Sequence, residues 1–382
     1  MTDPECEKRL TVIEGMYMHI KKTVSTNENA WTVIMMGVAA VSMVLHHFGG
    51  TSFLLLDLFF HVDVLVFFYL AGYSYAASAP SDESKRQLYK SRTIRHLKVY
   101  FGISMLLLLI YLAIWHFSDH SLSFSRILKA CGGILYARAG IFYPYFDASN
   151  QIYLFQISNG ALWFIPAMIL GEGILLIYFK AKASKKSGMD LLLILGLIIS
   201  GFVLKMPGIL LPWSIDTAPY IALIMIAGYE IAPVNLIREG KIGKTTLIVT
   251  GLALALYIFM VYADPGYNLS IREYGNFRFS MVFSLLCGIL GCVLLSEACK
   301  VLSRFAWFSV LAWIGKNALG IVGFHCLFID MLPVIANKTA AELSVIEAAG
   351  LLAGIIIILG GLSFFVFKIG ESIQRKKKSS AV

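Results

Sequence analysis

The chain has 382 residues, of which 58% are hydrophobic and only 14% are charged, and its mean hydropathy is +0.76. Soluble domains carry roughly 25% charged residues, so a water-soluble fold could not bury this much apolar surface, and lipid must be the solvent for most of it. The net charge of +9 does not indicate a nucleic-acid-binding protein, because the basic residues form short clusters between apolar segments.

The two ends of the chain differ from the apolar middle. Residues 1–30 are polar and lack the apolar stretch and cleavage site of a secretory signal peptide, so we expect a cytoplasmic extension. Residues 371–382 are basic, and we expect a cytoplasmic tail. Between them no repeat and no low-complexity tract divides the chain. The sequence therefore predicts one membrane domain over residues 31–370.

Long apolar runs recur along this domain, and about 20 residues suffice for a helix to cross the hydrocarbon core. They predict an all-α, polytopic transmembrane bundle of about ten spans. The predicted spans are 31–48, 52–79, 97–117, 160–179, 189–205, 216–235, 244–263, 277–299, 306–332 and 345–369.

The distribution of Lys and Arg indicates the orientation of these spans. With the N-terminus inside, 24 of the 32 basic residues fall in inner segments, and Lys316 lies within a span. The positive-inside rule therefore predicts an even number of spans with both termini cytoplasmic. We expect a multi-pass protein of the plasma membrane, in a bacterium the cytoplasmic membrane. The one long outer segment, 118–159, is aromatic-rich and is either interfacial or a flap over a pocket.

Ionisable side chains within the first two spans are candidates for function, because a charge inside a bilayer costs a few kcal/mol even on lenient scales. His46 and His47 point about 100° apart around a helix, so only one of them need face a cavity. Asp57 and His61 share a helix face, whereas Asp63 points elsewhere. These groups form either a polar clamp between helices or a functional cluster.

Two further groups of polar residues stand out. The ninth span contains Lys316 in its inner half and His325 in its outer half. Arg92 and Arg95 are three positions apart in an inner segment and would share a helix face at the membrane surface. Guanidinium groups suit phosphates, although ordinary positive-inside flanking is the alternative.

Several common functional motifs are missing from the sequence. It contains no P-loop, no HExxH, no GxSxG and no Rossmann glycine pattern. None of the six cysteines lies in a CxxC motif, and four of them lie in or beside apolar spans. We therefore expect no disulfide framework, no metal site and no bound cofactor.

Six segments nevertheless form an ordered set of motifs. They are MGVAAVSMVLHH (36–47), HVDVLVFFYLAGY (61–73), RTIR (92–95), ALWFIPAMI (161–169), LPWSID (211–216) and IGKNALGIVGFH (314–325). In this order they resemble the motifs of the acyltransferase family 3 membrane O-acyltransferases. The resemblance is closest to the branch of fucose 4-O-acetylases and of serine-racemase membrane domains.

The resemblance implies that the protein transfers an acyl group, usually acetyl from the co-substrate acetyl-coenzyme A, to a hydroxyl of a carbohydrate or another envelope molecule. It also implies that His47 is the general base or acyl relay and that Arg92 and Arg95 hold the phosphates of the donor. Two positions depart from the family pattern. Met36 stands where the family usually has Arg or Lys, and Ala71 stands where it has Ser.

Acyl transfer to a hydroxyl requires a base, a group that stabilises the oxyanion, and exclusion of water. We expect a catalytic cavity that His47, His61 and Asp63 share with His325. The predicted donor site consists of Arg92, Arg95 and Lys316, and the predicted acceptor site consists of Trp163, Asp216 and His325. For each aromatic residue near the acceptor site, interfacial anchoring is the ordinary alternative.

The expected partners are acetyl-coenzyme A, a carbohydrate or other hydroxyl acceptor, and the lipid bilayer, with no nucleic acid. The alternative function is a small-solute transporter or a ligand-sensing module on the same scaffold, which Met36 favours. Transporters often contain inverted repeats, and none is evident here.

Overall fold

The computed structural model describes residues 30–47, 54–117, 120–138, 141, 157–184, 188–205, 208–232, 244–276, 279–336, 339, 342–344 and 346–362. The predicted extension before residue 30, the tail 371–382 and the aromatic stretch 142–155 lie outside these residues. Within them, strands are limited to one short antiparallel hairpin, β1 (Tyr267–Asn268) and β2 (Glu273–Tyr274). The prediction of an all-α fold is confirmed.

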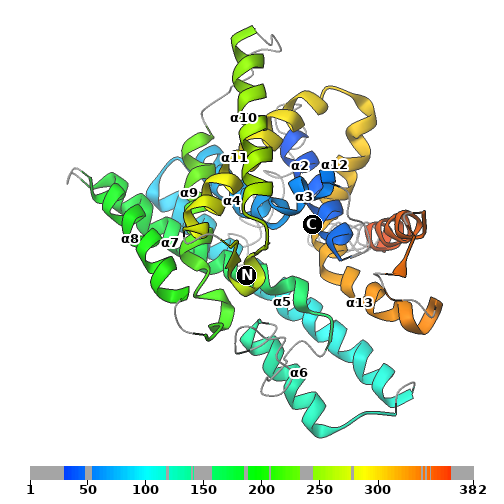
Figure 1. Cartoon of the computed structure of the whole chain (residues 1–382). Helices are drawn as coiled ribbons and strands as arrows, with labels where there is room; N and C mark the ends of the chain where they lie inside the picture. The colour runs from blue at the N-terminus through cyan, green and yellow to red at the C-terminus, as the bar shows by residue number, and fades with distance from the viewer. Residues whose placement is uncertain are drawn as a thin grey trace, which may run out of the picture.

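Figure 1 shows the helices of the described residues, most of which lie within the predicted apolar runs. They are α2 (Ala30–His46), α3 (Leu54–Phe60), α4 (Asp63–Ser78), α5 (Asp82–Phe117), α6 (Phe124–Tyr136), α7 (Phe164–Ala183), α8 (Met189–Lys205), α9 (Ala218–Ile231), α10 (Lys244–Ala263), α11 (Ser280–Leu302), α12 (Ser309–Lys316) and α13 (Ala318–Ala336). A further helix covers Ile346–Leu362, and short 3-10 turns include η2 (Gly160–Trp163) and η3 (Pro212–Ser214).

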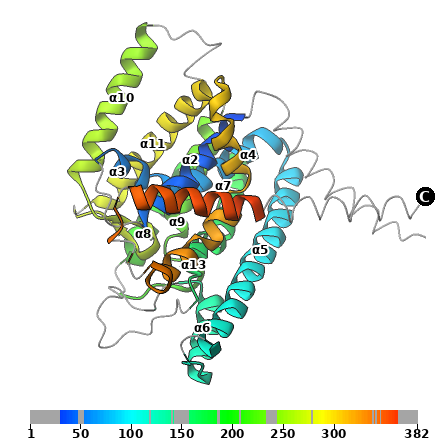
Figure 2. The same cartoon turned by 90° about the vertical axis from the view of Figure 1, so that its right-hand side faces the viewer.

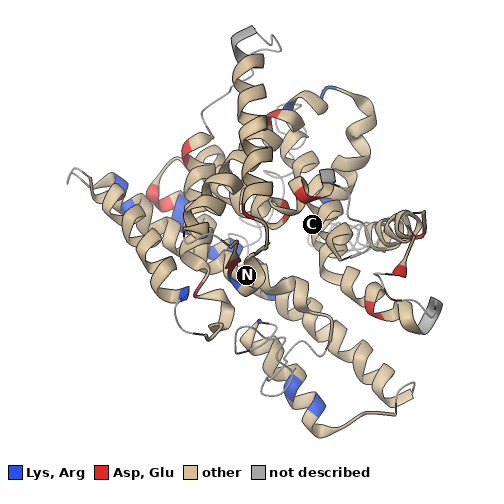
Figure 3. Cartoon of the chain, in the orientation of Figure 1, with Lys and Arg blue, Asp and Glu red and all other residues tan. Residues whose placement is uncertain are grey.

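Three helices of the described residues are long and apolar enough to cross a membrane. They are Asp82–Phe117, Gly160–Ala183 and Ser280–Leu302, and the bent pair α12–α13 is a fourth if it forms one span. Shorter apolar helices occupy the other predicted ranges. Lys, Arg, Asp and Glu occupy few positions along the ribbon (Figure 3). The chain is therefore an α-helical protein with the composition of a membrane protein.

Two of the predicted spans are broken helices. Helix α3 ends before His61, and α4 begins at Asp63. Helices α12 and α13 meet at an angle of 71° at Asn317. There the Asn317 side chain donates from Nδ2 to the Trp313 carbonyl at 2.8 Å, while its backbone N–H donates to Ile314. The side chain thus takes the carbonyl that an unbroken helix would pair with the Asn317 N–H, and the helix bends.

Small residues allow two pairs of helices to cross in backbone contact. A Cβ atom added at Gly72 would lie within 3.0 Å of backbone atoms of α9. A Cβ atom added at Gly228 would likewise lie within 3.0 Å of backbone atoms of α4. Gly37 of α2 and Gly315 of α12 form a second crossing with the same reciprocal overlap. Close approach through small residues is typical of helices packed in lipid, where van der Waals contact drives association.

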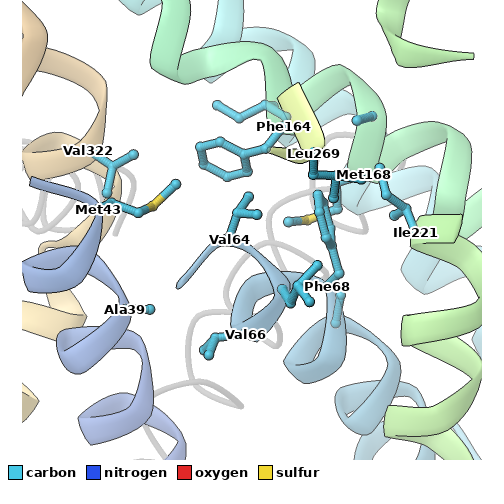
Figure 4. Close-up of a cluster of buried hydrophobic side chains, with 14 of the residues drawn as sticks. Ala39, Met43, Val64, Val66, Phe68, Phe164, Met168, Ile221, Leu269 and Val322 are labelled. Carbon is cyan, nitrogen blue, oxygen red and sulfur yellow. The ribbon is translucent and has the colours of Figure 1, made fainter. Parts of the chain in front are cut away.

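Apolar side chains fill the space between α2, α4, α7 and α9, as Figure 4 shows for Met43, Phe68 and Phe164 among others. Helix α5, with 36 residues, runs along one side of this core, and α6 lies at its far end (Figure 2). The Tyr100 hydroxyl of α5 donates to the Ile134 carbonyl of α6 at 2.7 Å. Part of the predicted outer segment is thus a helix packed on α5.

Contacts at the two ends of α2 show how its neighbours run. At its first turn, Trp31 lies 5.0 Å from the Tyr73 ring, late in α4, and beside Lys300, at the end of α11. At its last turn, His46 contacts Asp63, the first residue of α4. Helix α4 therefore runs antiparallel to α2, as expected of consecutive spans, and α11 ends where α2 begins. We call these two ends of α2 the Trp31 end and the His47 end.

Candidate active site

The tandem histidines at the end of α2 have different surroundings. His47 is exposed at the end of the helix, and its Nδ1 lies 2.9 Å from the Met43 carbonyl oxygen. Since a carbonyl can only accept, this contact assigns the ring proton to Nδ1 and leaves a lone pair on Nε2. His46 instead stacks on Phe60 and places Nδ1 3.4 Å from Asp63. Only His47 thus points toward the ninth predicted span.

His325 of α13 meets His47 across 278 positions of sequence. Its ring is fully buried, and Nε2 lies 3.3 Å from Nδ1 of His47. Its own Nδ1 lies 2.8 Å from the Val322 carbonyl, which fixes the proton on Nδ1 by the same argument. The bend at Asn317 re-directs α13 relative to α12 and thereby sets the approach of His325 to the end of α2.

A thiol, not predicted as a site residue, completes this cluster. Cys326 places Sγ 3.5 Å from Nε2 of His325 and 4.0 Å from Nε2 of His47. The other described cysteines have no such imidazole contact among the described residues, and Cys287, Cys292 and Cys299 are buried. The sequence signal is the adjacency of Cys326 to His325, which its apolar surroundings obscure.

Asp330, one turn after Cys326, anchors a second polar group. Its carboxylate accepts hydrogen bonds from the Tyr111 hydroxyl at 3.0 Å and from the Ser158 hydroxyl. Asn159 follows Ser158, is 2% exposed, and its side-chain amide has no hydrogen-bond partner among the residues that the structure describes. No local sequence pattern predicts Tyr111 or Ser158, because their shared partner Asp330 lies in a distant helix, and none marks Asn159.

His61 lies apart from the His47 cluster. It is 8% exposed and stacks on Tyr267 of β1 with 4.4 Å between ring centroids. Burial raises the pKa of Tyr267 well above its ordinary value of 10, so this hydroxyl stays protonated. The expected neighbour Asp57 is exposed, although its carbonyl accepts the His61 backbone N–H at 3.1 Å. In the structure His61 therefore contacts an aromatic ring. Asp63 contacts a different histidine, His46.

The two arginines of the predicted donor site face different surroundings. The Arg92 guanidinium pairs with Glu172 at 3.0 Å, donates to the Ser74 hydroxyl and lies over the Tyr75 ring. The Glu172 side chain has no exposed surface. Arg95 is exposed on the same helix. Arg92 is therefore held inward by a buried carboxylate, and Arg95 remains at the surface.

Asp216, predicted to bind the acceptor, lies between two buried arginines. Its Oδ1 pairs with Arg138 Nη2, and its Oδ2 lies 3.0 Å from Arg272 Nε. The three side chains are 1–3% exposed. Because both carboxylate oxygens are engaged, Asp216 joins the segments after α6, before α9 and between β1 and β2.

The remaining predicted residues do not meet the His47 cluster. Trp163 is 7% exposed and packs edge-on against Phe68. Lys316 is exposed at the end of α12, beside the bend. A small hollow in the described residues lies instead at the Trp31 end, where Trp31, Tyr73 and Lys300 help to line it. The structure thus brings together two of the predicted site residues, His47 and His325.

Comparison with known proteins identifies the family. The family model of the acyltransferase domain of acyltransferase family 3 matches residues 30–367. No curated protein and no solved structure matches the chain significantly. The matched range includes the whole His47 cluster and the Arg92–Glu172 pair. Because it covers most of the sequence, this chain belongs to acyltransferase family 3 and is a membrane acyltransferase.

Proposed function

We propose that the protein transfers an acetyl group from acetyl-coenzyme A to a hydroxyl of a cell-surface or exported carbohydrate, with His47 as general base or acyl relay. The observation that carries this proposal is the contact of His47 Nδ1 with the Met43 carbonyl, which leaves Nε2 unprotonated at an exposed helix end. An imidazole is suited to this task because its ordinary pKa lies near neutral pH.

The net reaction is the same whether His47 acts as base or relay. As a relay, the His47 imidazole would first form a bond to the acyl carbon, and that bond would break when the acceptor oxygen attacks. The bond between the donor sulfur and the acyl carbon breaks, a bond forms between that carbon and the acceptor oxygen, and the hydroxyl proton ends on the sulfur. A negative charge develops on the acyl oxygen on the way. The buried amide of Asn159, which has no partner among the described residues, is our candidate to stabilise it.

We propose ten transmembrane spans with both termini cytoplasmic. We also propose that the protein lies in the plasma membrane, which in a bacterium is the cytoplasmic membrane. The grouping of helix ends supports this topology. Lys182 pairs with Glu230 where α7 and α9 end, and Lys85 lies over the Phe179 ring beside them. Each of these basic residues belongs to a predicted inner segment. The ion triad at Asp216 joins three predicted outer segments.

The donor phosphates would bind at the cytoplasmic surface. We assign them to Arg95 and Lys316, which are exposed, and Arg92, paired with Glu172, would hold α5 in place beside them. Helix α2 has 17 residues, so its two ends are about 24 Å apart. The thioester would therefore have to reach far between the helices to meet His47.

For the acceptor we retain Trp163 and His325 from the sequence prediction. Asp216 is less suited, because both of its oxygens already form ion pairs. A sugar ring can stack on an indole and donate hydrogen bonds to an imidazole. His325 touches the ring of His47, so a hydroxyl bound there would be within reach of the proposed base.

Labelled acetyl-coenzyme A added to membranes that contain the protein tests the proposal. We expect His47→Gln to abolish transfer to surface carbohydrate at an unchanged protein level. The matched control is His116→Gln, at an exposed histidine outside the cluster, which should retain full activity. Full activity of His47→Gln would remove His47 from the chemistry. A wild-type protein that transports a solute but transfers no label would support the transporter alternative.

Titration of coenzyme A tests the donor site separately. Arg95→Ala should weaken coenzyme A binding, with the stability of the protein unchanged. Unaltered affinity of this variant would contradict the phosphate role of Arg95.

A further inference from the structure

Three side chains of metal-ligand type converge where the end of α2 meets α13. One ligand atom from each of His47, His325 and Cys326 lies within 4.8 Å of the other two. The sulfur of Cys326 is 3.5 Å from His325 Nε2 and 4.0 Å from His47 Nε2. In a tetrahedral zinc site, bonds of about 2.0 Å to nitrogen and about 2.3 Å to sulfur separate the two atoms by about 3.5 Å. The two sulfur–nitrogen distances are therefore close to those that a zinc ion requires.

Both imidazoles are also oriented as metal ligands are. His47 donates Nδ1–H to Met43, and His325 donates Nδ1–H to Val322, each to a carbonyl of its own helix. Histidines that bind metals almost always use their second nitrogen in this way, which fixes the tautomer. The Nε2 lone pair of His47 then lies beside the thiol of Cys326, and that of His325 lies between the thiol and the Nδ1–H of His47, 3.3 Å away. If the three side chains only formed hydrogen bonds with one another, the two rings would not both need to donate Nδ1–H to a backbone carbonyl.

The composition of the cluster indicates which ion fits. Two imidazoles and a thiol suit zinc and similar borderline metals, whereas calcium and magnesium prefer oxygen ligands. A Cys326 thiolate supplies one negative charge. Asp330, one helical turn after Cys326 in α13, supplies a second close by. The two negative charges balance a divalent ion, which reduces the cost of placing it in a membrane protein.

We propose that His47, His325 and Cys326 bind a zinc ion and that the bound zinc inhibits acyl transfer. Three protein ligands are the number found in zinc sites that keep one position for water or another ligand. The ion would occupy the Nε2 lone pair of His47, and the base or relay could then no longer act. The inhibitory half of this inference rests on the function proposed for His47, and the metal site itself does not.

Metal binding to the purified full-length protein in detergent tests the site without any activity measurement. We expect one equivalent of zinc to remain bound after gel filtration. Cobalt added alone should give the near-ultraviolet charge-transfer absorption of a thiolate ligand. Cys326→Ser should abolish that absorption and weaken zinc binding by at least about tenfold, since even the loss of an outer-shell partner costs 10–100-fold. The matched control Cys131→Ser, in α6, should retain both properties.

A second variant protects the test against misfolding. His325→Ala should weaken zinc binding while the protein still elutes as the wild type does. The site is overturned if the wild type binds no zinc, or if a correctly folded Cys326→Ser binds zinc as tightly as the wild type.

The inhibitory half has its own readout. Zinc should inhibit acetyl transfer by the wild type, and a chelator should restore it. Bound zinc with undiminished transfer would overturn the inhibition but leave the site in place. A wild type that binds zinc and transfers no acetyl group under any condition would contradict the proposed function and not the site.

Discussion

Replacing Glu172 by Gln is expected to destabilise the helical bundle, because it would leave the Arg92 guanidinium without its anionic partner. The Glu172 carboxylate is fully buried, lies 3.0 Å from Arg92 and accepts a hydrogen bond from the Tyr75 hydroxyl at 3.4 Å. The other Arg92 contacts are with the hydroxyl of Ser74, the carbonyl of Ala71 and the face of the Tyr75 ring. These neutral groups cannot cancel its charge.

The magnitude follows from the burial of the two partners. Removing one member of a buried ion pair typically costs about 3–5 kcal/mol, because the other charge stays behind. The Arg92 side chain is 20% exposed, so we expect the lower value, about 3 kcal/mol. This lowers the ratio of folded to unfolded protein more than about a hundredfold. The double variant Arg92→Met/Glu172→Met removes both charges and should lie within about 1 kcal/mol of the wild type.

Unfolding of the purified protein by sodium dodecyl sulfate, followed by tryptophan fluorescence, measures these differences. The matched control is Glu230→Gln. Its pair with Lys182 joins α7 to α9, as the Arg92–Glu172 pair joins α5 to α7, but the two side chains are 37% and 43% exposed, so the loss should stay below about 1 kcal/mol. If Glu172→Gln unfolds as Glu230→Gln does but loses affinity for coenzyme A, Arg92 binds the donor and the structural reasoning is refuted.

Two further predictions concern packing and the ion triad. Gly72→Ala should destabilise the protein by about 1–3 kcal/mol because its Cβ would overlap the Met225 backbone, whereas Gly102→Ala, with no neighbour within 4 Å, should be neutral or slightly stabilising. Identical unfolding curves for the two variants would contradict the close crossing. Asp216→Asn leaves two buried guanidinium groups with a neutral partner and should cost about 3–5 kcal/mol in the same assay. Unchanged stability with a raised KM for the acceptor would restore the acceptor role predicted from sequence.

The helices could be predicted because each apolar run is long enough to be one. Their breaks could not, since the bend depends on the Asn317 side chain taking the Trp313 carbonyl. An asparagine in an apolar run has that option at any position, and the surrounding packing decides whether it is used. The predicted range 52–79 likewise contains no Pro or central Gly to mark the break beside His61.

The candidate site could be predicted only in part. Position within the span placed His325 in the outer half, at the depth of His47, and the two rings are in contact. Cys326 resembles any small buried apolar residue in such a run, and it lies 279 positions from His47. The partners of Arg92 and Asp216 are also distant in sequence. Pairing between distant charges depends on how helices pack, which no local spacing encodes.

The triad at Asp216 has a consequence for the biogenesis of the protein. A chain inserted from its N-terminus can form the pair between Arg138 and Asp216 once α9 has emerged, but Arg272 arrives only after α10. Until then, one oxygen of Asp216 has only the Leu211 N–H and water. This face of the protein therefore closes late in synthesis. A nascent chain that ends before residue 272 should leave the connection 208–216 open to a protease that the finished protein resists.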